Sequence, residues 1–210
     1  MSPISRLVRR LAGALVIPLV IPLVIALAIA VSLAAPAAAS TLGPLEPHLL
    51  RGTDMAWTGD SGSNIYRLTN TSNGGNVKYF VAALPNGTAQ EISVSVGVKG
   101  LSGANYSGAG LVFNFDLDSR TYLALVLTAS NQLAIYQKSA QGMSELARLP
   151  QAIDTRGGMV QLTLRATGKG VDIEVDGAHQ GAIDGVGLRG QAGILAIDGG
   201  DYSFATYQAK

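Results

Sequence analysis

Residues 159–177 read MVQLTLRATGKGVDIEVDG, with apolar and polar side chains alternating on both sides of a glycine-rich turn. Successive side chains of a β-strand point to opposite faces, so Leu162 and Leu164 are expected to face the same way. Residues 171–175 repeat the alternation after the turn at 168–170, where glycine permits a tight reversal. The stretch therefore predicts an antiparallel hairpin with one face in a hydrophobic core.

The same alternation recurs along the chain in short runs separated by Gly, Asn, Asp and Ser, and no run has a helical period. The stretch PNGT at 85–88 predicts a hairpin turn, and residues 110–118 are expected to place Phe113 and Phe115 together in the core. About 10–12 short strands indicate an all-β sandwich or barrel. The predicted strands cover 64–70, 76–84, 89–100, 110–118, 121–129, 132–138, 144–150, 159–167, 171–176, 193–198 and 202–209.

Residues 1–39 have the pattern of a secretory signal peptide, a hydrophobic helix that precedes the fold. Three arginines lie within residues 1–10, residues 11–39 carry no charge, and an Ala-x-Ala site precedes Ser40. We expect cleavage before Ser40; uncleaved, the segment is long enough to be an N-terminal membrane anchor. Both outcomes predict an exported protein, extracellular, periplasmic or on the cell surface. Residues 40–51 form a proline-containing lead-in or linker, and residues 52–210 form one domain.

The charge and cysteine content exclude several classes of function. After residue 40 the chain has 12 Lys and Arg against 14 Asp and Glu, which gives no reason to expect nucleic acid as a partner. Cysteine is absent, which excludes disulfides and thiolate metal sites. With only two histidines, the sequence predicts no cofactor. The alanine-rich leader and the lack of cysteine suggest a bacterial source.

Three further stretches carry a family pattern together with the hairpin: AGLVFNFDLDSRTYLALVL at 109–127, NQLAIYQ at 131–137, and GQAGILAIDGGDYSFATYQ at 190–208. Their order resembles the concanavalin A-like lectin/glucanase superfamily, including its laminin G-like domains. The resemblance implies a two-sheet antiparallel jelly-roll sandwich. It also implies a glycan as the ligand class, although fold alone does not determine function.

The acidic residues of the hairpin are candidates for catalysis. Asp172, Glu174 and Asp176 alternate along one strand, and their side-chain tips are within reach of the carboxyl spacing of a retaining glycosidase. Glucanases of the superfamily have a strand motif E-x-D-x-E, and this sequence exchanges Asp and Glu at every position. The simpler interpretation is a solvated strand face, so we favour a non-catalytic protein and keep the hydrolase as the alternative.

Aromatic and acidic residues near turns are candidates for binding. A sugar ring can stack on an exposed aromatic side chain, and the candidates are Trp57, Tyr66, Tyr106, Tyr122 and Tyr202. A calcium ion is the one metal that the sequence leaves open, with Asp116 and Asp118 as its candidate ligands.

The sequence thus predicts an exported binding or cell-envelope interaction module directed at a glycan. The alternatives are a polysaccharide hydrolase that uses the carboxylates at 172, 174 and 176, and an adhesion or scaffolding domain with a protein partner. Contact with a membrane is expected only if the N-terminal segment stays uncleaved.

Overall fold

The computed structural model describes residues 42–62, 64–101, 106–156 and 158–210, which belong to one compact unit of the chain. The predicted signal segment 1–39 and its cleavage site lie outside the described residues. Within the described ranges, no helix is both long enough and apolar enough to cross a membrane.

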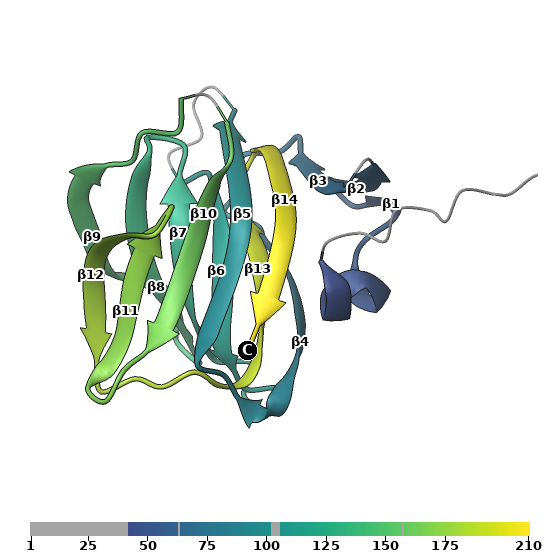
Figure 1. Cartoon of the computed structure of the whole chain (residues 1–210). Helices are drawn as coiled ribbons and strands as arrows, with labels where there is room; N and C mark the ends of the chain where they lie inside the picture. Colours follow the sequence, from purple (N-terminus) through teal and green to yellow (C-terminus); the bar gives the residue numbers. More distant parts are fainter. Residues whose placement is uncertain (1–41, 63, 102–105, 157) are drawn as a thin grey trace, which may run out of the picture. The chain divides into compact units, whose positions relative to one another are not determined.

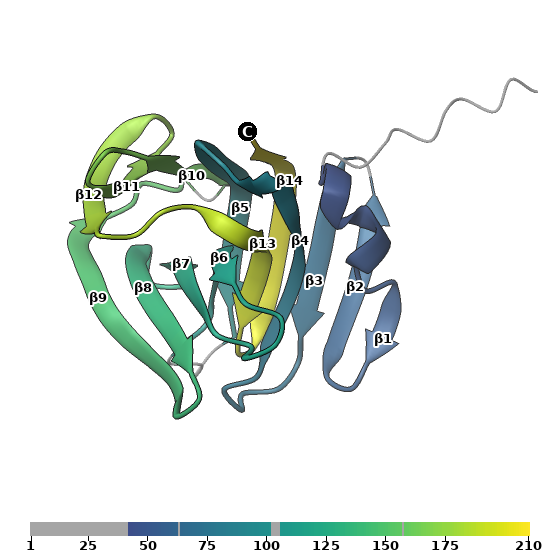
Figure 2. The same ribbon diagram turned by 90° about the horizontal axis from the view of Figure 1, so that it is seen from below.

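Two antiparallel sheets pack face to face, as Figures 1 and 2 show. The larger sheet has the strand order β1 (Gly52–Asp54), β2 (Trp57–Gly62), β3 (Ile65–Asn70), β14 (Gly200–Ala209), β5 (Glu91–Gly100), β10 (Val160–Ala166), β11 (Gly170–Val175) and β12 (Ala178–Asp184). The smaller sheet has the order β4 (Val77–Thr88), β13 (Arg189–Ile197), β6 (Gly108–Phe115), β7 (Tyr122–Thr128), β8 (Gln132–Ser139) and β9 (Gly142–Ala152). The predicted all-β sandwich is therefore confirmed.

The predicted hairpin at 159–177 is formed by β10 and β11. Leu162 pairs with Val175 and Leu164 pairs with Ile173, and all four side chains are buried. Each buried aliphatic side chain of this kind contributes roughly 1.5–3 kcal/mol to folding. The residues between them face away from the other sheet. The alternation in the sequence therefore places the apolar side chains of β10 and β11 in the core.

Residues 42–51, the described part of the predicted lead-in or linker at 40–51, pack against the core between the sheets. Its 3₁₀-helix η1 (Gly43–His48) places Leu42 and Leu45 in the core, and both are fully buried. The Tyr66 hydroxyl donates a hydrogen bond to the carbonyl oxygen of Leu50 at 3.1 Å. These contacts make residues 42–51 part of the folded unit instead of a free linker.

The stretch PNGT does not reverse the chain into a hairpin, and that prediction is wrong. Asn86 and Gly87 both have positive φ angles, of 54° and 76°, and they form a bulge within β4 opposite β13. The chain then crosses to the other sheet, where β5 pairs with β10 and β14. Asn86 and Gly87 therefore adopt backbone angles typical of turn residues, but β4 continues through them to Thr88.

The prediction for β6 is also wrong in one respect. Phe113 lies in the core between the sheets, whereas Phe115 lies on the outer face of the six-stranded sheet. The register with β13 shifts between these positions, and Asn114 has a φ of 53°. Such a bulge inserts one extra residue and moves the next side chain to the opposite face.

Candidate functional site

The outer face of the six-stranded sheet carries a second apolar cluster, separate from the core between the sheets. Its buried members are Val112, Phe115, Tyr122, Ala124, Val126, Ala134, Tyr136, Leu195 and Ile197. Outer faces of antiparallel sheets are commonly polar and solvated. Neighbouring side chains cover these residues almost completely, so a candidate ligand site lies where this apolar face opens to solvent.

An open groove of about 730 Å³ lies over one end of this face. The volume is within the usual range of small-ligand sites. Its wall is mostly aromatic and apolar, with three charged side chains among the lining residues. The lining residues are Gly75, Val77, Tyr79, Tyr106, Arg120, Tyr122, Tyr136, Lys138, Met143, Glu145 and Ile197.

The aromatic rings of the groove support one another. Tyr122 stacks on Phe115, with ring centroids 5.7 Å apart and planes inclined by 13°. Tyr79 contacts both rings, with its centroid 5.0 Å from that of Phe115 and 5.8 Å from that of Tyr122. Because β4, β6 and β7 each supply one ring of this cluster, the position of Tyr122 depends on the sheet as a whole.

Tyr136, on β8, has a buried hydroxyl. Its oxygen has no hydrogen-bond partner among the described residues, although the carboxylate of Glu145 is close enough to affect it electrostatically. Burial, with the charge of Glu145, raises the pKa of Tyr136 to about 12. Burial likewise raises the pKa of Tyr122 to about 12. Both hydroxyls therefore keep their protons at neutral pH and remain hydrogen-bond donors.

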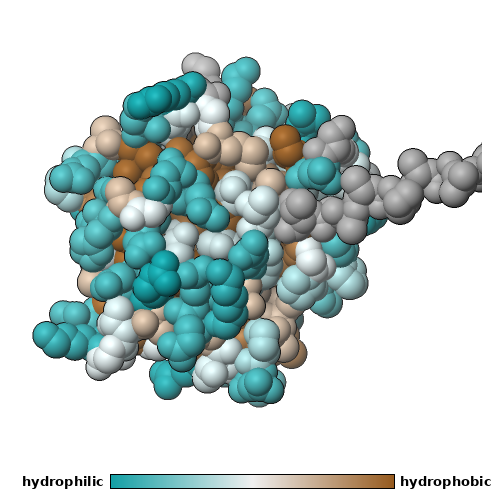
Figure 3. Space-filling model, in the orientation of Figure 1, coloured by the Kyte–Doolittle hydropathy of each residue, from teal (hydrophilic) through white to brown (hydrophobic). Residues whose placement is uncertain are grey.

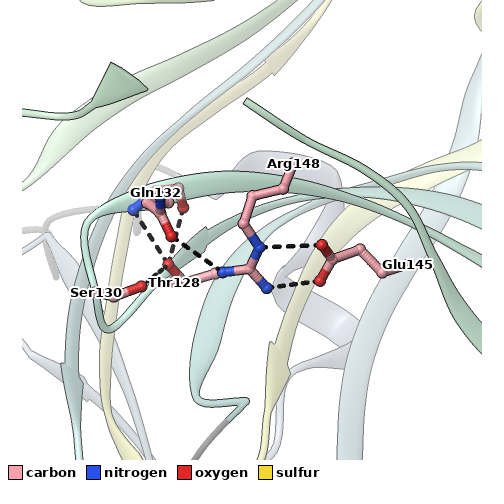
Figure 4. Close-up of polar contacts among 5 residues, drawn as sticks. All are labelled: Thr128, Ser130, Gln132, Glu145 and Arg148. Atoms are coloured by element: carbon pink, nitrogen blue, oxygen red, sulfur yellow. Dashed lines mark hydrogen bonds and ion pairs between the residues drawn. The ribbon is translucent and has the colours of Figure 1, made fainter. Parts of the chain in front are cut away.

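One carboxylate lines the groove, and it is paired. The guanidinium of Arg148 binds Glu145 through two contacts, Nη2–Oε2 at 2.6 Å and Nε–Oε1 at 3.0 Å (Figure 4). Hydrogen bonding to Arg148 holds the pKa of Glu145 below its usual range. The third contact of Arg148 is with the side-chain oxygen of Gln132 at 3.3 Å.

The turn before β8 fixes Gln132 by its backbone. The backbone N–H of Gln132 donates to the Thr128 hydroxyl at 3.1 Å, and that hydroxyl lies 3.0 Å from the Gln132 carbonyl oxygen (Figure 4). Ser130 adds a contact with the same hydroxyl at 2.9 Å. The bidentate pair of Arg148 and Glu145 thus adjoins an ordered turn.

The loop before β4 reaches the groove through Gly75 and is fixed by Asp198. The Asp198 carboxylate accepts hydrogen bonds from the backbone N–H groups of Gly74 at 2.9 Å and Gly75 at 3.2 Å. The Asn70 side-chain amide donates to the Asp198 carbonyl oxygen at 2.9 Å. Asp198 is itself buried, so this clasp connects the core to one rim of the groove.

Comparison with known proteins identifies the architecture. No family model and no curated protein matches the chain. Among solved structures it is similar to the carbohydrate-binding module CBM66 from Bacillus subtilis, with 15% identity, a TM-score of 0.51, and coverage of 76% of this chain and 92% of that chain. The chain has the concanavalin A-like lectin/glucanase fold. The resemblance seen in the sequence is confirmed at this level.

Two further solved structures of lower similarity are a galectin and a glycosidase. A tetrameric galectin from the sponge Cinachyrella sp. matches at 11% identity, with a TM-score of 0.44, over 64% of this chain and 99% of that chain. An endo-β-galactosidase from Clostridium perfringens that releases GlcNAcα1-4Gal matches at 9% identity, with a TM-score of 0.49, over 72% of this chain and 53% of that chain.

The concanavalin A-like sandwich separates the five aromatic residues singled out in the sequence. Tyr106, which is 61% exposed, and Tyr122 both line the groove. Trp57, Tyr66 and Tyr202 are buried in the core between the sheets, where their rings pack against other side chains. We therefore keep Tyr106 and Tyr122 in the candidate site and leave the other three out of it.

Sequence reasoning missed Tyr79 and Tyr136. The available signal was the continuous apolar runs LALVL at 123–127 and LAIY at 133–136. A strand whose two faces are both covered is expected to be apolar throughout, whereas a half-exposed strand alternates. These runs indicate that the six-stranded sheet of this concanavalin A-like fold is not simply solvated on its outer side.

The acidic row lies on the other sheet of the concanavalin A-like fold. Figure 3 shows mostly hydrophilic side chains over this face. Glu174 forms an ion pair with Arg165 at 3.2 Å, and Asp176 sits in the turn with a φ of 48° and accepts a hydrogen bond from the Gln161 N–H at 2.8 Å. Asp172 lies beside a separate hollow at the β10–β11 turn. The three carboxylates thus have different surroundings: Glu174 is in an ion pair, Asp176 is in a turn, and Asp172 lies beside a separate hollow.

The candidate calcium ligands lie in the exposed loop between β6 and β7. The Asp116 carboxylate accepts hydrogen bonds from the Ser119 N–H at 2.7 Å and the Ser119 hydroxyl at 2.8 Å, which lowers its pKa. Asp118 is exposed in the same loop. Across the described ranges, no three His, Asp or Glu side chains are grouped to hold a metal.

Proposed function

We propose that this protein is a non-catalytic glycan-binding module and that the groove on the six-stranded sheet is its binding site. The observation that carries the proposal is the set of four tyrosines, Tyr79, Tyr106, Tyr122 and Tyr136, around one open apolar groove. Sugar rings present C–H groups that pack on aromatic faces, while their hydroxyls need a few polar partners. The groove offers both. The similarity in fold to a carbohydrate-binding module supports the assignment.

Binding without turnover follows from the carboxylates. A glycosidase of the usual type needs two carboxyl groups on either side of the bond to be cleaved, about 5–9.5 Å apart. Among the described residues that line the groove, Glu145 is the one carboxylate, and Arg148 binds both of its oxygens. Glu174 on the opposite sheet is likewise paired. Neither pattern suits a general acid or a nucleophile.

The setting that we propose is outside the cytoplasm, with a glycan of the cell envelope or surroundings as the partner. The support is the signal-like pattern of residues 1–39. A protein partner is the alternative, and it predicts that the protein binds no glycan.

Binding of the full chain to a glycan array tests the proposal, with hydrolysis of each bound glycan measured in parallel. We expect Tyr106→Ala and Tyr79→Leu each to weaken binding about five-fold or more, because each removes a stacking surface worth about 1 kcal/mol. Glu174→Gln, on the opposite sheet, is the matched control and is expected to bind like the unaltered protein. Release of sugar products that Glu174→Gln abolishes contradicts the proposal, as does binding that both tyrosine variants retain in full.

A further inference from the structure

Two cationic side chains in the groove have no carboxylate partner. Arg120 extends from the β6–β7 loop, and Lys138 lies on β8. Lys138 is the direct cross-strand partner of Tyr122, so the two side chains share the outer face of the sheet. Neither cation forms an ion pair with any carboxylate in the described part of the chain. They are therefore available to a ligand.

The negative charge of Glu145 in the groove is balanced by Arg148 beside it. Glu145 is held by both of its oxygens to Arg148, so this carboxylate does not neutralise Arg120 or Lys138. The groove is thus positively charged, although residues 41–210 as a whole contain more acids than bases, 14 against 12. A local field opposite in sign to the charge of the surrounding protein favours an anionic ligand.

Tyr136 provides an independent indication. Its side chain is 7% exposed and lines the groove. Its hydroxyl forms no hydrogen bond of normal geometry among the described residues, although the Glu145 carboxylate, which Arg148 holds by both oxygens, is close enough to interact with it. A buried polar group without a partner is costly, and in native proteins it usually has a function. A negatively charged oxygen is the strongest acceptor for such a donor.

Resting on the proposed function, we infer that the glycan bound in this groove carries an anionic group, either a carboxylate, as in a uronic acid, or a sulfate ester. The tyrosine rings pack on the sugar, and Arg120 and Lys138 bind the anion. The planar guanidinium of Arg120 can donate two parallel hydrogen bonds to either group, and the ammonium of Lys138 adds a point charge.

Matched polysaccharides test the inference on the full chain by titration calorimetry at low and high salt. One pair is polygalacturonate and its carboxyl-reduced form; the other is dextran sulfate and dextran. We expect the anionic member of one pair to bind at least ten-fold more tightly than its neutral match and to weaken as salt rises. The pair that responds distinguishes a carboxylate from a sulfate ester.

Charge-removing variants locate the effect. Arg120→Gln and Lys138→Gln are each expected to weaken binding of the anionic glycan about ten-fold, a larger loss than either variant causes for the neutral match. The controls are Arg67→Gln on β3 and Lys169→Gln in the β10–β11 turn, which remove the same charge elsewhere. Equal losses for controls and groove variants overturn the inference, because the effect is then one of net charge.

Failure of the inference and failure of the proposed function differ in outcome. Equal affinity for the anionic and neutral members of both pairs overturns the inference and leaves a neutral glycan as the ligand. Binding to no member of either pair, and to nothing on the glycan array, overturns the proposed function and the inference with it.

Discussion

Phe113 and Phe115 are two residues apart on β6, and their rings lie on opposite faces of the six-stranded sheet. Asn114 lies between them with a φ of 53°, and its side-chain oxygen accepts a hydrogen bond from the Arg189 N–H at 2.9 Å. The bulge thus moves one phenylalanine out of the core and under Tyr122, which lines the groove. A local backbone irregularity supports the candidate site.

Replacement of Asn114 tests the importance of this bulge. Asn114→Ala is expected to lower the free energy of unfolding by about 2 kcal/mol, because alanine is strained at a positive φ and loses the hydrogen bond to Arg189. Asn114→Gly relieves the strain and is expected to cost about half as much. Urea denaturation of the two variants measures both values. Equal stability of Asn114→Ala and the unaltered protein would show that the bulge carries no such cost.

The sandwich could be predicted from the sequence wherever alternation is uninterrupted. Leu162 and Leu164 repeat at period two and are followed by a glycine-rich turn, so local pattern and final register agree. The predictions are wrong at positions where one residue with an unusual backbone conformation interrupts the alternation of a strand. Asn114 and Asn86 have positive φ angles that the period-two pattern does not contain.

The candidate site was harder to predict, because it depends on contacts between distant strands. Tyr79 on β4 and Tyr122 on β7 are far apart in the sequence, and their rings lie 5.8 Å apart between centroids. A neighbouring Gly, Ser or Asn suggested exposure for Trp57 and Tyr202, yet tertiary packing buries both. The residues that neighbour an aromatic residue in the sequence do not determine whether its side chain faces the core or the solvent.

The Asp198 clasp is expected to stabilise the loop at the groove. Asp198→Gly removes the acceptor for the Gly74 and Gly75 N–H groups without straining the backbone, which has a φ of 63° at this position. Hydrogen bonds to a charged group are each worth about 1.5–3 kcal/mol, so we expect removal of the two to lower the free energy of unfolding by about 3 kcal/mol. Asp198→Asn keeps an acceptor oxygen and is the control. Faster amide hydrogen exchange of Gly74 and Gly75 in Asp198→Gly alone is the second expected result.

Acid is expected to weaken the eight-stranded sheet through Glu91. Hydrogen bonds from Lys210 at 2.9 Å and a contact with Arg165 at 2.7 Å hold the pKa of Glu91 below its usual value of 4.5. Because the folded-state pKa is lowered, the carboxylate stabilises the fold above about pH 4.5, and this contribution is lost as the pH falls through the folded-state pKa.

Glu91→Gln tests this contribution to stability. It is expected to lower the free energy of unfolding by about 1 kcal/mol at pH 7 and to have a smaller effect at pH 3, because acid protonates Glu91 and removes the charge that the variant lacks. Denaturation at several pH values measures the difference. The control is Asp118→Asn, which removes an exposed carboxylate that no described cation pairs. A loss that is the same at pH 3 and pH 7 would assign the effect of Glu91→Gln to packing.

Tyr136→Phe is expected to separate stability from binding. The hydroxyl of Tyr136 is buried without a hydrogen-bond partner among the described residues, so its removal is expected to raise the free energy of unfolding by about 1 kcal/mol. Because the hydroxyl is proposed to bind the ligand, the same change is expected to weaken glycan binding several-fold, as where a protein gives up stability for function.

Tyr202→Phe is the matched control, because the Tyr202 hydroxyl donates to the Ile197 carbonyl oxygen at 2.6 Å and its loss is expected to destabilise the fold. Denaturation and calorimetry on the two variants measure these effects, and a destabilised Tyr136→Phe that binds glycan normally would remove Tyr136 from the site.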